Sequence, residues 1–139
     1  HSTTGFCLIL AGVAIVYSSK RQPCIALSST EAEIIAASAC ACEVVFVRAL
    51  LAEMGLAQDG PTTLRVDNSG AVELARDRKS CHRSRHVDRR FFKVRELEAL
   101  HIVRVEHVPT ALNRADVLTK AVDKETFLRH RASLMNVQG

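Results

Sequence analysis

Aromatic residues are scarce in this sequence of 139 residues: tryptophan is absent, tyrosine occurs once, and aromatics make up 4% of the chain. Proteins that bind single strands of nucleic acid stack bases on aromatic rings, so this scarcity argues against such a platform. Acidic residues are absent before Glu31, so the segment ahead of it offers no carboxylate for catalysis or metal binding. Glycine and proline are few, and no repeat or low-complexity segment occurs. We therefore expect a single domain, residues 1–139.

Signals for membrane insertion and export are also lacking. No apolar run approaches the roughly 18 residues of a membrane span, and no secretory signal is recognisable. We expect no membrane partner. The first residue is not Met, so we expect a processed product or a piece of something longer.

The five cysteines, at positions 7, 24, 40, 42 and 81, are odd in number and irregularly spaced. This predicts buried free thiols in a reducing compartment, the cytoplasm or the nucleus. Zinc binding by Cys81, His82 and His86 is the weaker interpretation, because no partner CxxC exists.

The hydrophobic pattern predicts an α/β fold. A tight hairpin around Gly12 joins apolar strands at 4–11 and 13–18. A turn at 19–23 and a third short strand at 24–27 are expected next. The remaining pattern predicts strands at 62–66 and 102–108 and helices at 28–54, 69–76, 86–99 and 124–135. The helix at 86–99 is expected to have an apolar stripe of Val87, Phe91, Val94 and Leu97, and the amphipathic helix at 124–135 is expected to use Phe127, Leu128, Arg131, Leu134 and Met135. Strand and helix alternation after a hairpin indicates a mixed sheet flanked by helices.

Glu33 is the most informative residue of the first helix. Ser28 and Glu31 are spaced as a capping box, and Gly55 is placed as a C-cap. Glu33 then shares a stripe with otherwise apolar residues, namely Ala37, Cys40, Val44, Val47 and Leu51. A carboxylate that points into a hydrophobic core lowers the stability of the fold unless a cation or a metal ion binds to it. The alternative is an acid at the edge of the first turn, favoured by the helix dipole.

Two further acids, Asp67 and Asp116, lie where strand-like segments give way to helical ones. In α/β sheets, catalytic and ligand-binding residues are commonly located at the ends of strands and the starts of helices. Three such acids, with Glu33, suggest a metal-dependent site.

Positive charge is unevenly spread in a chain of net charge +4. Between Arg76 and Arg95 only Asp77 and Asp88 oppose a dense run of Arg and Lys. Such a cluster attracts phosphate backbones, although a solvated helix face is the simpler interpretation. The run comprises Arg76, Arg78, Lys79, Arg83, Arg85, Arg89, Arg90, Lys93 and Arg95.

Several blocks of sequence, in order and with consistent spacing, resemble the ribonuclease H domain of copia-type retrotransposon polyproteins. They cover nearly the whole chain and are STTGF at 2–6, SSKRQP at 18–23, ALSSTEAE at 26–33, VDNSGA at 66–71, RHVD at 85–88, VPT at 108–110 and ADVLTK at 115–120. The resemblance implies a ribonuclease H-like mixed sheet and an endonuclease that cuts the RNA strand of RNA–DNA hybrids.

The resemblance also implies a two-metal site that holds Mg²⁺, with Mn²⁺ as a substitute. By motif, Glu33, Asp67 and Asp116 are its catalytic and metal-binding acids. Without metal, at least one of these acids should have a raised pKa. Nucleic-acid contacts are expected from the basic segment and from residues beside the acids: Lys20, Arg21, Asn68, Arg78, Lys79, Arg83, Arg85, His86 and Arg89. Asn68 has a second interpretation as a helix cap.

One departure from the family pattern bears on activity. In the family, the first strand and its catalytic aspartate precede the block at 2–6, and this chain begins at His1. We therefore expect a weak or inactive enzyme unless another chain, a second copy or an omitted segment supplies that strand. The alternative function is a catalytically inactive, domesticated domain that binds nucleic acid or assists assembly. A nuclease that processes DNA on the same fold is a third interpretation.

Overall fold

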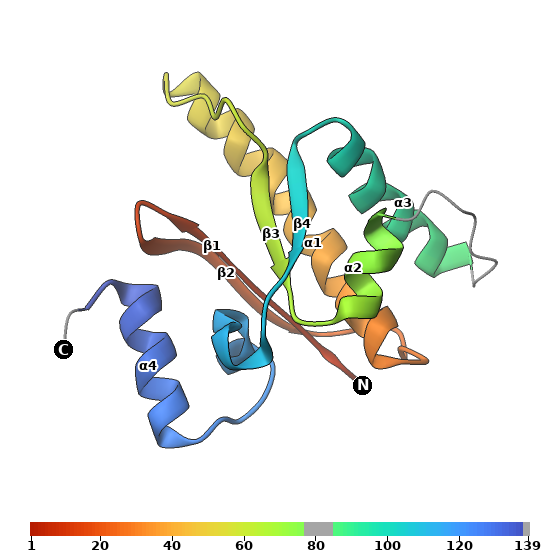
Figure 1. Cartoon of the computed structure of the whole chain (residues 1–139), viewed down its shortest axis with the longest axis vertical. Coiled ribbons are helices and arrows are strands. Elements are labelled where there is room, and N and C mark those ends of the chain that lie inside the picture. The colour runs from red at the N-terminus through yellow and green to blue at the C-terminus, as the bar shows by residue number, and fades with distance from the viewer. Residues whose placement is uncertain (77–84, 138–139) are drawn as a thin grey trace.

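The computed structural model describes residues 1–76 and 85–137 and has a mixed α/β architecture (Figure 1). The predicted fold class, helices combined with short sheets, is confirmed. Its helices and strands are, in order, β1 (Thr3–Leu10), β2 (Val13–Arg21), α1 (Ser29–Glu53), β3 (Thr62–Val66), α2 (Ser69–Arg76), α3 (Arg85–Ala99), β4 (Val103–His107), the 3-10 helices η1 (Thr110–Leu112) and η2 (Arg114–Leu118), and α4 (Lys124–Met135).

Within the described residues, the strands form two separate pairs. β1 and β2 are antiparallel, and β3 and β4 are parallel. The hairpin turn has positive φ at both central residues, 50° at Ala11 and 85° at Gly12, which suits the right-handed twist of paired strands. The gap between the two pairs is visible in Figure 1.

The expected turn at 19–23 and the strand at 24–27 are wrong. β2 continues to Arg21, where it pairs with Thr3, so Lys20 and Arg21 are strand residues. Residues 24–27 form no strand. Pro23 lacks the N–H that a sheet ladder needs, and Ile25 and Leu27 are 69% and 86% exposed.

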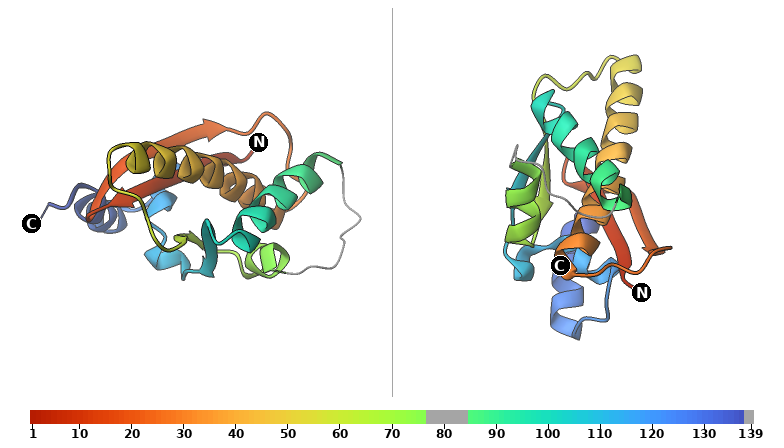
Figure 2. Two further views of the ribbon diagram at one scale, coloured as in Figure 1. Left: turned by 90° about the horizontal axis from the view of Figure 1, so that it is seen from above. Right: turned by 90° about the vertical axis from the view of Figure 1, so that its right-hand side faces the viewer.

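The long helix α1 joins the two strand pairs. It packs against β1, β3 and α3 (Figures 1 and 2). Its start is the predicted cap: Ser28 Oγ accepts from the Glu31 backbone N–H at 3.1 Å, and Glu31 Oε2 accepts from the Leu27 N–H at 2.9 Å. Gly55, with φ of 78°, follows the end of the helix.

The expectation that no apolar run reaches the length of a membrane span is wrong. By length and composition alone, α1 could cross a membrane. The same test is passed by core helices of soluble proteins, and the buried side chains of α1 are what a core helix requires. They are Ile34, Ile35, Ala37, Ser38, Cys40, Ala41, Val44 and Leu51.

The hydrophobic core lies between α1, the β3–β4 pair, α2 and α3. Val103 and Val105 of β4 are each 1% exposed. Phe91, Val94 and Leu97 of the predicted α3 stripe are buried, and the side chain of Val87 lies outside the described residues. The range predicted for the last helix is confirmed, but its apolar stripe is not. Phe127, Leu128 and Met135 are exposed, and the buried residue of α4 is His130.

The prediction of buried free thiols is confirmed only for Cys40, whose burial raises its pKa to about 12. Cys7 and Cys24 are half-buried and Cys42 is exposed. All four are free. Cys42 is exposed because it lies two residues from Cys40 and so faces another side of α1.

Gly5 allows η2 to lie directly against β1. A Cβ built on Gly5 would clash with Thr119 Cγ2 and come within 3.1 Å of Leu118 Cβ. Ser19 Oγ of β2 donates to the Leu118 carbonyl at 2.6 Å. The hairpin thus holds the segment that carries Asp116.

The substitution Gly5→Ala should therefore lower the free energy of unfolding by about 1–3 kcal/mol, because the added methyl overpacks the contact with η2. Gly60→Ala is the matched control, since a Cβ there meets no atom within 4 Å. Urea unfolding of both variants measures the difference. Equal stability of the two variants would show that η2 is not held by this contact.

Candidate active site

Three carboxylates from distant parts of the sequence meet at one end of the structure. Glu33 lies in the second turn of α1, Asp67 directly follows β3, and Asp116 lies in η2. Glu33 and Asp67 are half-buried, and Asp116 is 8% exposed. Burial raises the pKa of Glu33 to about 7, and the negative charges of Asp67 and Asp116 add to this rise. Such an effect needs all three groups in one neighbourhood.

Local hydrogen bonds hold the acid-bearing segments. Asn68 caps α2, with its Oδ1 accepting from the Ala71 N–H at 3.0 Å. Thr30 Oγ1 donates to the same oxygen at 3.3 Å and so links the starts of α1 and α2. The capping interpretation of Asn68 is confirmed, while its contact with nucleic acid stays a prediction.

Asn113 caps η2 in the way that Asn68 caps α2. Its Oδ1 accepts from the Ala115 N–H at 3.1 Å, and its Nδ2 donates to Asp116 Oδ1 at 3.3 Å. Asp116 is therefore oriented by a neighbour three residues before it.

Lys120 supplies the counter-charge. Its Nζ lies 2.8 Å from Asp116 Oδ2. The hydrogen bond to Asp116 is the main cause of a raised Lys120 pKa, and the charges of Asp116, Asp67 and Glu33 act in the same direction. The positive charge of Lys120 in turn lowers the pKa of Glu33. A side-chain ammonium thus partly neutralises the acidic cluster.

The donor chemistry of this cluster fits Mg²⁺, which prefers carboxylate oxygens. The arrangement is looser than a finished metal site. Among residues 1–76 and 85–137, no three His, Cys, Asp or Glu side chains are grouped closely enough to hold one ion. The three acids are electrostatic neighbours, and the Lys120 ammonium takes up one oxygen of Asp116. Coordination of one ion by all three would require the carboxylates to move closer together and Lys120 to release Asp116.

The structure describes only some of the residues predicted to contact nucleic acid. Lys20 and Arg21 at the end of β2 and Arg89 on α3 are exposed. Arg78, Lys79 and Arg83, with Cys81 and His82 of the zinc alternative, lie outside the described residues, as do the side chains of Arg85 and His86.

Other cations of the basic segment have structural partners. Arg76 donates to the Val105 carbonyl at 2.6 Å, and Arg90 donates to Cys24 Sγ at 3.7 Å. The Arg95 guanidinium lies 5.1 Å from the centroid of the Phe91 ring. The segment is therefore not a uniformly solvated basic face.

Lys120 and His130 are the neighbours of the site that sequence reasoning missed. The i,i+4 spacing of Asp116 and Lys120 was a usable signal for the first. His130 is 3% exposed, and its Nε2 has no hydrogen-bond partner in the described part of the chain. Burial lowers its pKa, Arg129 adds to this, and the charge of Asp116 opposes it. Nothing in the pattern of α4 indicated that its histidine would be the buried residue.

Comparison with known proteins finds relatives among transposon polyproteins. The chain is 36% identical over 126 residues to the retrovirus-related Pol polyprotein from transposon TNT 1-94 of Nicotiana tabacum. It is 32% identical over 126 residues to those from transposons RE2 and RE1 of Arabidopsis thaliana. Each alignment covers 91% of this chain and 9% of the relative, so the chain spans about a tenth of the proteins it matches. No protein-family model and no solved structure matches it.

The raised pKa of Glu33 predicts a pH-dependent stability. In the unfolded chain this carboxyl ionises near 4.5 and in the folded chain near 7, so the folded state loses stability as the pH rises through this window. Glu33→Gln, which stays neutral, should stabilise the metal-free protein at pH 8 by roughly 1–2 kcal/mol, a value reduced for solvent screening. The gain should vanish below pH 4.5. Thermal unfolding at both pH values, with the exposed Glu53→Gln as control, measures it.

Removal of the Lys120 charge should raise the pKa of Glu33 further, because that charge lowers it in the intact protein. Lys120→Met is the test, and the side-chain carboxyl signal of Glu33 followed by NMR is the measurement. Lys124→Met removes an exposed charge of the same type from the start of α4 and should leave the Glu33 titration unchanged. An unchanged titration in Lys120→Met would contradict the coupling.

Proposed function

We propose that this chain is a ribonuclease H-type endonuclease domain that cleaves the RNA strand of RNA–DNA hybrids. The observation that carries the proposal is the gathering of Glu33, Asp67 and Asp116, which come from a helix, a strand end and a 3-10 helix. The homologues, which are retrovirus-related Pol polyproteins from transposons, support an origin in a retroelement.

In this proposal Glu33, Asp67 and Asp116 hold two Mg²⁺ ions, which Mn²⁺ can replace. When bound, such ions supply activation of the attacking water and stabilisation of the leaving oxygen. The chain itself has other tasks. Asn113 and Asn68 keep Asp116 and the start of α2 in place, and Lys120 has to release Asp116.

The exposed cations Lys20, Arg21 and Arg89 would contact phosphates of the hybrid. Phosphate contacts confer affinity and steep salt dependence but no sequence selectivity. The free thiols of the described residues suit a reducing compartment such as the cytoplasm or the nucleus.

A second function, as an inactive subunit that binds nucleic acid or assists assembly, is favoured by one specific observation. The Lys120 ammonium already neutralises Asp116, and the described acids do not form a finished metal site. A domain that has lost catalysis could retain its acids in this way.

The substitution Asp67→Asn separates the two functions. If the domain is a nuclease, Asp67→Asn should lower cleavage of a labelled RNA–DNA hybrid in Mg²⁺ by about 100-fold or more. Hybrid binding measured in EDTA should stay within about twofold, because phosphate contacts supply the affinity. Asp59→Asn, in the exposed loop before β3, is the matched control and should cleave as the parent does. Equal cleavage by Asp67→Asn and the parent would refute the nuclease proposal.

A further inference from the structure

We infer that Gln22 is a positioning residue of the candidate active site. Its side-chain amide fixes the start of α1 against the hairpin and so sets where Glu33 lies relative to the other two acids. Gln22 forms no hydrogen bond with any of the three acids and acts through the Ala32 carbonyl. The inference concerns the geometry of the acids, and only its last experiment, on metal binding, rests on the proposed function.

Gln22 lies at the junction between the hairpin and the loop that leads to α1. Its backbone N–H donates to the Ser2 carbonyl at 2.8 Å, just beyond the last residue pair of β1 and β2. Gln22 is 2% exposed. Its Nε2 donates to Thr4 Oγ1 of β1 at 3.1 Å and to the Ala32 carbonyl of α1 at 3.0 Å. One buried amide thus connects the first strand with the helical turn that directly precedes Glu33.

This amide is the polar link between the hairpin and α1. Within residues 1–76 and 85–137, no other hydrogen bond joins residues 1–22 to the helix. The remaining contact is apolar, with Phe6 and Leu8 of β1 packed in one cluster with Ile34 and Ala37 of α1. Apolar contacts are non-directional, whereas a hydrogen bond weakens steeply with distance and angle. The amide therefore limits the position of α1 more narrowly than the packing does.

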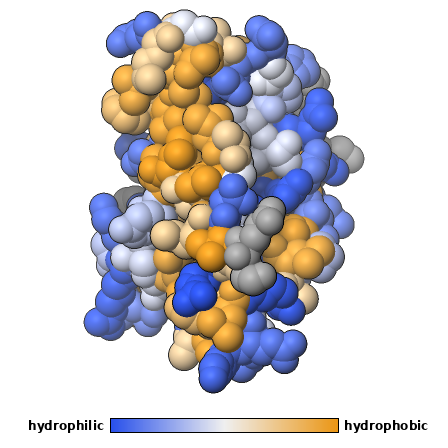
Figure 3. Space-filling model, turned by 90° about the vertical axis from the view of Figure 1, so that its left-hand side faces the viewer, coloured by the Kyte–Doolittle hydropathy of each residue, from blue (hydrophilic) through white to orange (hydrophobic). Residues whose placement is uncertain are grey.

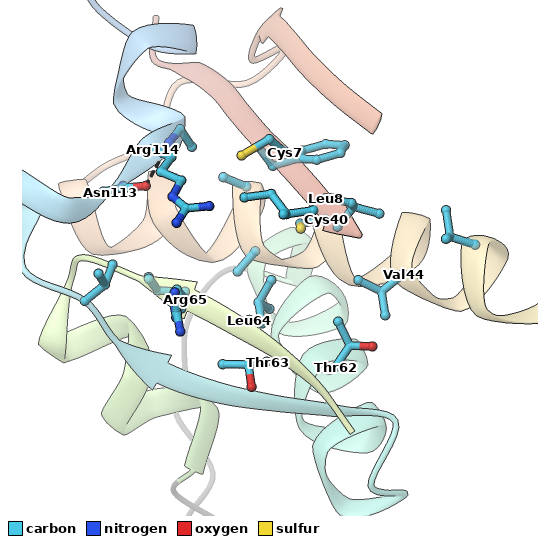
Figure 4. A pocket seen from close by; sticks show the side chains of 18 of the residues that line it. Cys7, Leu8, Cys40, Val44, Thr62, Thr63, Leu64, Arg65, Asn113 and Arg114 are labelled. Atoms are coloured by element: carbon cyan, nitrogen blue, oxygen red, sulfur yellow. Dashed lines mark hydrogen bonds between the residues drawn. The ribbon is translucent and has the colours of Figure 1, made fainter. Parts of the chain in front are cut away.

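The two strand pairs do not fix this position themselves. β1 and β3 belong to separate pairs, and a cavity of about 400 Å³ lies between them with Glu33 in its lining. Figure 4 shows Leu8 of β1 on one side of α1 and Leu64 of β3 on the other. Figure 3 shows a band of hydrophobic residues across one face of the molecule, so apolar contact is available over a wide area. Hydrogen bonds at the start of α1 therefore have to determine where the helix lies.

The start of α1 is held from two sides. Thr30 Oγ1 donates to Asn68 Oδ1 at 3.3 Å and ties the helix to the residue that follows Asp67. Gln22 ties the helix to β1, and η2 with Asp116 also lies against β1. The two hydrogen bonds thus place the helix that carries the first acid against the segments that carry the other two.

The amide of Gln22 also leaves one polar atom without a partner. Gln22 Oε1 is buried and accepts no hydrogen bond from the described residues. Reversal of the amide would bring this oxygen against the Ala32 carbonyl, which can only accept. A methionine would fill a similar space without a buried, unpaired acceptor, so a space-filling role does not require glutamine. What glutamine adds is the fixed direction of its two N–H bonds.

The test is Gln22→Met, which keeps the length of the side chain and removes both of its hydrogen bonds. We expect the melting temperature to change by less than about 4 °C, because loss of the unpaired acceptor offsets loss of the bonds. The pKa of Glu33 should fall from about 7 toward its ordinary value of 4.5, since a carboxyl that is free to move gains solvent and distance from like charges. NMR of the Glu33 carboxyl in the metal-free protein should show a proton affinity about threefold lower or more.

Arg48→Met is the matched control, because Arg48 holds the other end of the same helix. Its guanidinium donates to the Gly60 and Gln58 carbonyls at 2.7 and 2.9 Å. It lies about 22 Å from Glu33 along the helix axis, beyond the range of unscreened charge, so the Glu33 titration should stay as in the parent. A Glu33 pKa that is unchanged or raised in Gln22→Met would overturn the inference. Failure of Gln22→Met to fold would overturn it as well, since the amide would then be a requirement of the fold.

Thr4 provides a second pair of variants that leaves Gln22 intact. Thr4→Val removes the acceptor on β1, keeps the shape of the side chain and should lower the Glu33 pKa in the same direction as Gln22→Met does. Thr4→Ser retains the hydroxyl and should titrate as the parent does. Equal Glu33 titration in the two Thr4 variants would overturn the bridge between β1 and α1.

Binding of Mn²⁺, measured by calorimetry, connects this position with the proposed function. If Glu33 binds metal, Gln22→Met should weaken Mn²⁺ binding about tenfold or more, as loss of a hydrogen bond that orients a ligand does at metal sites. Arg48→Met should bind Mn²⁺ as the parent does. A lowered Glu33 pKa with unchanged Mn²⁺ binding supports the positioning and contradicts the metal role of Glu33. Weaker Mn²⁺ binding with an unchanged Glu33 pKa overturns the positioning and leaves the metal role standing.

Discussion

Mutual repulsion of three half-buried or buried carboxylates is the constraint on which the site depends. Burial and the charges of Asp67 and Asp116 together raise the pKa of Glu33 to about 7. The cost is tolerated because Lys120 places an ammonium 2.8 Å from Asp116 and because Asn113 donates to the same carboxyl. Divalent cations would relieve the same repulsion more strongly, so the electrostatics that make the acids costly also suit them to bind metal.

The supports of this cluster come from both strand pairs. Glu33 belongs to α1, Asp67 follows the end of β3, and Asp116 belongs to η2, which Gly5 and Ser19 hold against the hairpin. The geometry of the three acids therefore depends on how far apart the two strand pairs stand.

Much of the local structure was predictable from sequence because its causes are local. The Ser28 and Glu31 cap, the Gly12 turn, the Asn68 cap and the ends of α4 follow from side chains acting within a few residues. The strand predicted at 24–27 was wrong because an apolar composition does not reveal a pairing partner, and Pro23 just before it lacks the N–H that a sheet ladder needs. The prediction of an apolar stripe on α4 was wrong for a related reason. The sequence pattern of a helix does not reveal which of its faces packs against the rest of the protein.

The sequence by itself determined which residues are available for chemistry: three acids at strand and helix ends, oxygen donors of the kind Mg²⁺ prefers, and arginines in one run. Tertiary structure alone decided that the acids share one neighbourhood, that Lys120 and His130 lie beside them, and that several arginines are committed to structural contacts. It also decided that the described strands form two separate pairs. Propensity and capping act over a few residues, whereas charge coupling and strand pairing depend on distances between residues far apart in the chain, which only the folded backbone sets.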